Sequence, residues 1–452
     1  MKRIFGLLLP ALLAACYTPE PFETETVNSA SSTQSKIGTL YAVNNEIQIC
    51  NPSVTQDTVN YPASMLWLNF GGTLYVTPSD SGFPTEAEEH DRLTISDTAG
   101  KVLWYVMRDT SEGECQFQDP EWSTHPDFAV ALRAYDKKKK NLCLPENLDY
   151  GMFAVRFSDK KKFWFYDKEI REDASPHLWV APDASADVDD DAETVEGFFG
   201  TSDVRLVYVN DDDKIVFVDF ANGGLKKSVT LQRPSGKKGW GVDAPMISPD
   251  GKFVVYNLTE NSSTWEAYVQ ELSASSTPVK IERWNKSLSE PGQPHWFAYS
   301  GRLFVVWIEV PSGKQMFNKE LLSNESVQDG SAGRTLMREI RLMAGAPSDL
   351  AVEWVGDARE IAPIPMTGGR SPDAKFLSTG YKYGYCWNFR EVDDEEFLIE
   401  VWQEVRCGRV SRGGRHLRVC RFFQRSGRTR YPLGIYRRVR CRRFRWRRKR
   451  WH

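Results

Sequence analysis

The sequence lacks the short motifs that mark common catalytic centres. Its 452 residues contain no G-x-S-x-G, H-E-x-x-H or Walker A segment. These absences exclude a hydrolase nucleophile elbow, a zinc-protease helix and a phosphate-binding P-loop. None of the six histidines lies four residues from another, so no helix can carry a paired histidine metal site. We therefore predict no catalytic residue, no metal and no cofactor.

Cysteines are few, and no two have the C-x-x-C spacing typical of zinc or redox sites. The chain has eight of them, at positions 16, 50, 115, 143, 386, 407, 420 and 441. Cys115 and Cys143 form the nearest pair in the body of the chain. Spacing alone does not fix connectivity, so both a disulfide and two free thiols stay open for this pair.

Helical periodicity is also scarce, and short β-type runs take its place. These runs are rich in β-branched and aromatic residues, and clusters of Gly, Asp, Asn, Ser and Pro separate them. Examples are residues 73–77, 101–106, 162–166, 204–209, 214–218, 252–256 and 302–308. The pattern predicts an all-β protein.

The first sixteen residues combine two basic side chains, an apolar run too short to span a bilayer, and small residues. Their end, Leu13-Ala14-Ala15-Cys16, resembles a bacterial lipobox. The resemblance implies a signal peptide over residues 1–15, cleavage before Cys16, and acylation of that cysteine. Because Tyr17 follows Cys16 where some sorted lipoproteins have Asp, the resemblance favours the outer membrane. Residues 16–36, rich in Thr, Ser, Glu and Pro, are expected to form a flexible tether.

Acidic side chains are missing altogether from the end of the chain. Residues 406–452 hold 18 Arg, one Lys and no Asp or Glu, whereas the other 405 residues hold 39 basic and 61 acidic side chains. Three interpretations stay open for this basic segment: translation out of frame, a cationic segment that binds anionic lipid, or a solvated tail. We expect it to be disordered, and we do not expect a nucleic-acid partner.

Several β-type runs follow a proline-aspartate turn. The fullest copy is Ser248-Pro249-Asp250-Gly251; Ser371-Pro372-Asp373 lacks the glycine and His125-Pro126-Asp127 lacks the serine. Proline fixes φ, aspartate accepts bonds from the turn backbone, and glycine adopts a conformation that other residues avoid. Apolar positions repeat after 47 residues from Leu206 to Phe253 and after 50 from Phe253 to Leu303. These intervals are typical of one four-stranded propeller blade.

The turn and the strand that follows it resemble the repeat of TolB-type β-propellers, also found in the propellers of prolyl-oligopeptidase-like proteins. The resemblance is good over residues 204–309 and partial at 119–132 and 368–377. It implies a β-propeller of about five to eight blades over residues 37–405, with an irregular last blade. The turn residues are structural in this family.

Other candidate sites have simpler interpretations. His125 and His295 each lie beside Pro and Trp, which favours packing or turn bonding over catalysis. The alternating acids of residues 183–191 resemble a calcium loop, but they have Val188 at the place of its glycine. The Asp211–Asp213 run is typical of a hairpin turn. The many tryptophans favour core packing over sugar-binding platforms.

These observations favour an envelope lipoprotein whose propeller binds or scaffolds a protein, peptide or glycan. The alternative is a glycan-active lyase or hydrolase built on the same fold. The two hypotheses differ in one testable feature, since acid-base catalysis needs two carboxylates that converge in one pocket with a raised pKa.

Overall fold

The structure, a computed structural model, divides the chain into two units, Met1–Arg390 and Glu391–His452. It describes residues 32–34, 39–42, 49–74, 76–78, 82–137, 143–166, 170–184, 193–221, 227–261, 264–284, 287–313, 333–344, 350–362, 364–379, 385–388, 403–412, 415–426 and 429–432. The predicted signal peptide, Cys16 and most of the calcium-like loop lie outside these residues.

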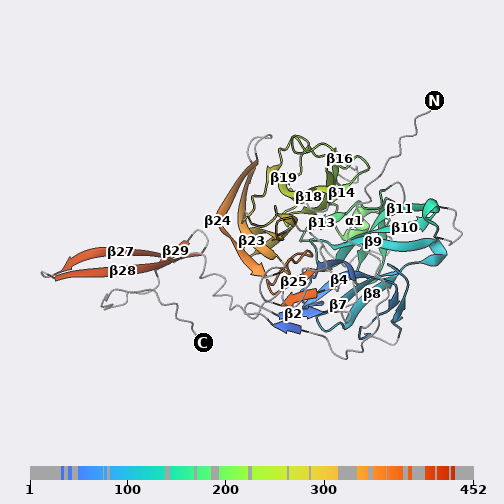
Figure 1. The fold of residues 1–452 in the computed structure, drawn as a ribbon, viewed down its shortest axis with the longest axis horizontal. Helices are drawn as coiled ribbons and strands as arrows, with labels where there is room; N and C mark the ends of the chain where they lie inside the picture. The colour runs from blue at the N-terminus through green and yellow to red at the C-terminus, as the bar shows by residue number, and fades with distance from the viewer. Residues whose placement is uncertain are drawn as a thin grey trace. The chain divides into compact units, whose positions relative to one another are not determined.

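Six four-stranded antiparallel sheets form the first unit (Figure 1). The first is β3 (Ile49–Val54), β4 (Ser64–Asn69), β7 (Arg92–Asp97) and β8 (Val102–Met107), with the small hairpin β5 (Gly72–Thr73) and β6 (Glu86–Ala87) inserted. The second is β9 (Glu114–Trp122), β10 (Phe128–Asp136), β11 (Leu148–Arg156) and β12 (Lys162–Tyr166). The third is β13 (His177–Val180), β14 (Val204–Val209), β15 (Ile215–Asp219) and β16 (Lys227–Thr230).

The remaining sheets continue the same meander. The fourth is β17 (Gly241–Ile247), β18 (Phe253–Asn261), β19 (Thr264–Glu271) and β20 (Val279–Lys280). The fifth is β21 (Gly292–Tyr299), β22 (Arg302–Glu309), β23 (Arg334–Ala344) and β24 (Leu350–Ala362). In the sixth, β25 (Phe376–Thr379) and β26 (Tyr385–Asn388) pair with β2 (Thr39–Ala42) and β1 (Ser32–Gln34) from the other end of the unit. One short helix, α1 (Val195–Phe199), precedes β14.

The sheets are the blades of a propeller, because an edge strand of each sheet contacts an edge strand of a neighbouring sheet. β3 contacts β9, β9 contacts β13, β13 contacts β17, β17 contacts β21, and β25 contacts β3. The Val54 amide donates to the Gly368 carbonyl at 3.0 Å, which joins the last blade to the first. The predicted all-β propeller is confirmed, with six blades, and its last blade is irregular because both ends of the unit build it.

Apolar side chains fill the space between neighbouring blades. One cluster joins Phe128 and Leu132 of β10 to Leu178 of β13 and Leu206 of β14. Comparable clusters lie between the other successive pairs from the first blade to the fifth. Trp67, Trp122 and Trp307 are among the largest fully buried side chains, in keeping with a packing role for the tryptophans. Side chains on both faces of a blade are buried, so the strands read as nearly continuous apolar runs.

The repeat read from the sequence marks the second strand of a blade. Leu206, Phe253 and Leu303 lie near the beginning of β14, β18 and β22. The proline-aspartate turn therefore does not open a blade, since the turn at 248–251 joins the first strand β17 to the second strand β18. Each blade begins one strand earlier. The sequence pattern did not mark this first strand because its polar residues weaken the apolar signal.

Two terminal segments differ from expectation. β1 lies within residues 16–36, which we expected to be a tether, and pairs with β2. In the second unit, β27 (Gln403–Arg412), β28 (Arg415–Ser426) and β29 (Thr429–Pro432) form a three-stranded sheet. Disorder was predicted from Arg406 onward, and the paired strands contradict it for the described part of this segment. Valine, leucine and phenylalanine interrupt the arginines often enough for strands to pair. The units also divide at Arg390, upstream of the predicted boundary at residue 405.

Within the described part of the chain, no helix has the length and hydrophobicity needed to cross a membrane.

Candidate binding site on the propeller axis

The innermost strands share a feature that the sequence analysis missed. In five blades a residue with left-handed φ stands directly before a proline: Asn51 (+44°), Asp119 (+44°), Ser175 (+44°), Ala244 (+49°) and Gln293 (+46°). A register shift in the strand pairing accompanies this dipeptide in four of the five blades. Such β-bulges redirect side chains and interrupt regular pairing. The repeated X-Pro dipeptides at 51, 119, 175, 244 and 293 are the signal that would have located the axis.

These positions are joined by hydrogen bonds from blade to blade. The Asn51 amide donates to Asp119 Oδ1 at 2.7 Å, and the Ser175 backbone N–H lies 3.3 Å from Asp119 Oδ2. Ser175 Oγ donates to Asp243 Oδ1 at 3.3 Å, and Gln293 Nε2 donates to Asp243 Oδ2 at 3.0 Å. Five blades are thus connected through two carboxyl groups, and both of these groups contact Ser175. We call these five residues the axial network.

A second set of polar side chains lies two residues further along the same strands. Ser53 Oγ donates to Glu121 Oε1 at 2.5 Å, which again connects the first blade to the second. His177 follows Ser175 by two residues, and His295 follows Gln293 by two. Both histidines are buried. The axis therefore holds a third carboxyl group and two imidazoles, two residues further along the strands than the axial network.

Burial changes the protonation of the three carboxyl groups. Burial and, to a smaller extent, the negative charge of Asp243 raise the pKa of Asp119 to about 7. Burial also raises the pKa of Glu121 to about 8 and raises that of Asp243. All three side chains keep partial contact with solvent, as expected for groups that line an axis. Near neutral pH the axis therefore holds carboxyl groups that can exchange protons.

The axial histidines are neutral and engaged with the backbone. The Ile247 amide donates to His177 Nδ1 at 3.1 Å, and His295 Nδ1 lies 3.1 Å from the Gln293 carbonyl oxygen. Burial lowers the pKa of His177 to about 3 and that of His295 to about 4. In the His125 turn, the Asp127 amide lies 3.3 Å from His125 Nδ1. Both histidines that the sequence singled out therefore bond to nearby backbone.

The Ser248 turn is built from short local contacts. Ser248 Oγ donates to Asp250 Oδ1 at 2.5 Å and accepts from the Phe253 amide at 2.9 Å. The Pro249 carbonyl accepts from the indole of Trp179 at 2.9 Å, so the turn also contacts the preceding blade. Gly251 has a φ of +72°.

The Ser371 turn repeats this geometry. Ser371 Oγ donates to Asp373 Oδ1 at 2.6 Å and accepts from the Phe376 amide at 2.9 Å, with Pro372 between them in the chain. Ala374 occupies the place of the glycine with a φ of +65°. The Ser248 turn follows the innermost strand β17, and the Ser371 turn follows residues 368–370, which pair with β25. The axial network lies nearer the beginning of the innermost strands. The turns and the network therefore lie toward opposite ends of the propeller.

Other predicted features take clear positions. Cys115 and Cys143, left open by the sequence, form a disulfide. The Asp211–Asp213 run lies in the turn between β14 and β15, where Asn210 Oδ1 accepts from the Asp212 and Lys214 amides. Among the described residues, no cluster of three His, Cys, Asp or Glu side chains is arranged to hold a metal ion.

No protein-family model and no curated protein matches the chain. Solved structures similar to it include TolB from Acinetobacter baumannii, at 11% identity and a TM-score of 0.36 over 73% of this chain and 64% of that one. The chain thus covers less than two thirds of that protein.

Two further structural neighbours are propellers with different names. A putative TolB from Agrobacterium tumefaciens has 13% identity and a TM-score of 0.37, over 80% of this chain and 100% of that one. An exo-1,5-alpha-L-arabinanase from a bovine ruminal metagenomic library has 10% identity and a TM-score of 0.32, over 68% and 97%. The assignment of the fold rests on the six sheets and their contacts.

Proposed function

We propose that this protein is a lipid-anchored binding or scaffolding module of the cell envelope. Its ligand, a protein, peptide or glycan, meets the propeller at the end where the axial network lies. Acylated Cys16 holds the protein to the outer membrane, and the basic segment after Arg406 adds affinity for anionic lipid. Cys16→Ser tests the anchor, because incorporation of a clickable palmitate analogue should then be lost.

The axial network is the observation that supports a binding role most directly. Asp119 and Asp243 each accept hydrogen bonds on both carboxyl oxygens from other blades. The network therefore fixes the relative positions of the innermost strands and of the loops that lead into them. A preorganised surface loses little entropy when a ligand binds. Binding sites also commonly occupy loops that a rigid scaffold positions.

An enzyme remains the second candidate, and one observation favours it. A general acid at neutral pH needs a carboxyl group with a raised pKa, and Asp119 and Glu121 both have one. Catalysis also needs a carboxyl oxygen directed at the substrate. Both carboxyl oxygens of Asp119 and Oε1 of Glu121 accept hydrogen bonds from other blades, and for this reason we favour binding over glycan cleavage.

The test uses the full chain and two matched variants. Asp119→Asn changes the axial network, whereas Asp127→Asn changes a carboxylate in the His125 turn at the other end of the same blade. We expect immobilised wild-type protein and Asp127→Asn to retain the same envelope protein or glycan, and Asp119→Asn to lose it. Equal retention by all three would contradict binding at the axis. Release of new reducing ends from an envelope glycan, lost in Asp119→Asn, would establish the enzyme instead.

A further inference from the structure

A cleft of about 350 Å³ lies between the first and second blades, away from the axial network. Its lining includes Glu88, Glu89, Arg108, Gln116, Leu148 and the Cys115–Cys143 disulfide. This volume is within the range of small-ligand sites. The cleft combines carboxylates, one amide and an apolar wall, and nothing in the axial function uses these groups.

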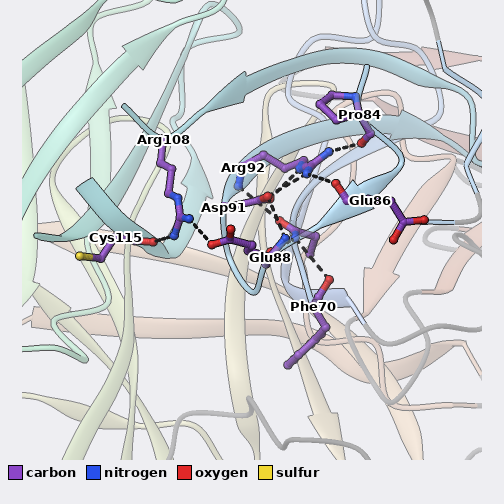
Figure 2. A network of polar contacts seen from close by, with 9 residues as sticks. Phe70, Pro84, Glu86, Glu88, Asp91, Arg92, Arg108 and Cys115 are labelled. Atoms are coloured by element: carbon purple, nitrogen blue, oxygen red, sulfur yellow. Dashed lines mark hydrogen bonds and ion pairs between the residues drawn. The ribbon is translucent and has the colours of Figure 1, made fainter. Parts of the chain in front are cut away.

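The wall that carries Glu88 is held by a buried arginine, as Figure 2 shows. Arg92 pairs with Asp91 at 2.6 and 2.8 Å and donates to the backbone carbonyls of Pro84 and Glu86. Asp91 Oδ2 also accepts from the Glu88 amide at 3.0 Å. The Phe117 amide donates to the His90 carbonyl at 2.9 Å and connects this loop to β9. The carboxylates are thus carried by a fixed segment of backbone.

The opposite wall is fixed by Arg108 and by the disulfide. Arg108 donates to the Cys115 carbonyl and pairs with Glu88 (Figure 2). Cys143 is bonded to Cys115, which holds the segment leading to Leu148 against β9. Leu144, beside Cys143, is 41% exposed and adds apolar surface to this segment. The two walls are therefore preorganised and differ in polarity.

The charges of the described residues that line the cleft do not balance. Arg108 is the cation of the lining, its side chain is only 15% exposed, and its donors serve Glu88 and the Cys115 carbonyl. Glu88 is 75% exposed. Within the described part of the chain, the Glu89 carboxylate has no hydrogen bond or ion pair. One carboxylate is left over, beside a wall on which an aliphatic stem can pack.

We propose that this cleft binds the side chain of an arginine or lysine in a peptide segment of a partner protein. Its charged end pairs with Glu89 and with the open side of Glu88, its aliphatic stem lies along Leu148 and the disulfide, and the Gln116 amide bonds the peptide backbone. This assignment goes beyond the proposed function, because it adds a second binding place, separate from Asp119, with its own ligand chemistry.

The test measures binding of a short peptide, acetyl-Gly-Arg-Gly-amide, to the full-length protein by ligand-observed NMR. The matched probe carries citrulline, which keeps the shape of arginine without its charge. We expect the arginine peptide to bind about tenfold more tightly than the citrulline peptide. Glu89→Gln should remove about that factor. Glu86→Gln, on the same loop with its carboxylate bonded to Thr73, should leave the affinity unchanged.

Two outcomes would overturn the proposal: equal binding of the two peptides, or undiminished preference for arginine in Glu89→Gln. Thermal melting of each variant shows whether it is folded. The Asp119→Asn variant separates this proposal from the axial one, since it should bind the arginine peptide normally. If Asp119→Asn loses the peptide and Glu89→Gln keeps it, the axis is the binding site and the cleft is not.

Discussion

The two ends of the propeller are built in different ways. At one end, the Ser248 and Ser371 turns form through contacts between residues no more than five positions apart. At the other end, the axial network joins residues 50 to 68 positions apart and includes carboxyl groups whose pKa is raised. One end is therefore held mainly by local contacts, whereas the other end changes its charge with pH and depends on contacts between neighbouring blades.

The largest effect should come from the end held mainly by local contacts. A Cβ at Gly251 would lie 2.4 Å from Arg205 Nη1 and 2.7 Å from the Trp179 ring, at a φ of +72°. Gly251→Val should lower the free energy of unfolding by about 4 kcal/mol, measured by urea denaturation. Gly236→Ala is the control, since its φ is +76° but no atom lies within 4 Å of the added Cβ. It should cost only about 1 kcal/mol. Equal costs for the two variants would show that the packing against Trp179 is unimportant.

The next effect concerns the disulfide between Cys115 and Cys143. Replacing both Cys115 and Cys143 by serine removes a bond between residues 28 positions apart. A cross-link of this span should contribute about 3 kcal/mol by restricting the unfolded chain. Melting of the wild type with and without reductant checks this value, and the double serine variant should not respond to reductant. A wild type that is equally stable after complete reduction would contradict the prediction.

The third prediction concerns pH and distinguishes the two ends directly. In the folded protein Asp119 has a pKa of about 7, above its unfolded value of about 3.9. The folded state therefore binds more protons between these values. The stability that protonated Asp119 contributes to the folded state is complete below pH 4 and is lost as pH rises through 7. Asp119 is partly exposed, so we expect its own contribution to the free energy of unfolding to fall by about 2 kcal/mol over this range, measured as the difference between the wild type and Asp119→Asn.

Asp119→Asn should flatten this pH dependence, whereas the Gly251 variants should keep it. Urea denaturation at a series of pH values between 4 and 8 makes the measurement. The same pH dependence in the wild type and in Asp119→Asn would show that Asp119 is ionised in the folded state.

The smallest effect should come from Ala374, which has a φ of +65° in the second turn. Ala374→Gly relieves that conformation but makes the unfolded chain more flexible. We expect a net gain of about 0.5 kcal/mol, checked by the midpoint of thermal unfolding. A loss of stability would mean that the Ser371 turn tolerates alanine without strain, unlike the Ser248 turn.

The parts of the structure that could be predicted are those encoded locally. The β-type runs gave the strand class, and Leu206, Phe253 and Leu303 gave the blade interval, because both signals lie within one blade. The first strand of each blade was not recognised as the start of the repeat, because its polar residues face the axis. The contact of Asp119 with Ser175, like that of Ser175 with Asp243, requires blades that only the closed ring brings together. The raised pKa of Asp119 depends on the same ring.

The sixth blade was hidden for a similar reason. β1 and β2 have too few apolar residues to be recognised as strands. The partner of β2 is β26, which lies with β25 near the far end of the unit. Such pairing leaves no periodic trace within a single segment. The disulfide required the distance between two loops, which the spacing of the cysteines does not give.

The mixed origin of the sixth blade has a consequence for how the chain is made. β2 can pair with β26 only after nearly the whole unit has been synthesised. Contacts between residues so distant in the sequence form slowly, because a long loop must close first. Until that moment β2 and β26 each have an unpaired edge, which can join another copy of the chain. The ring should therefore depend on a holding chaperone during its biogenesis more than its final stability would suggest.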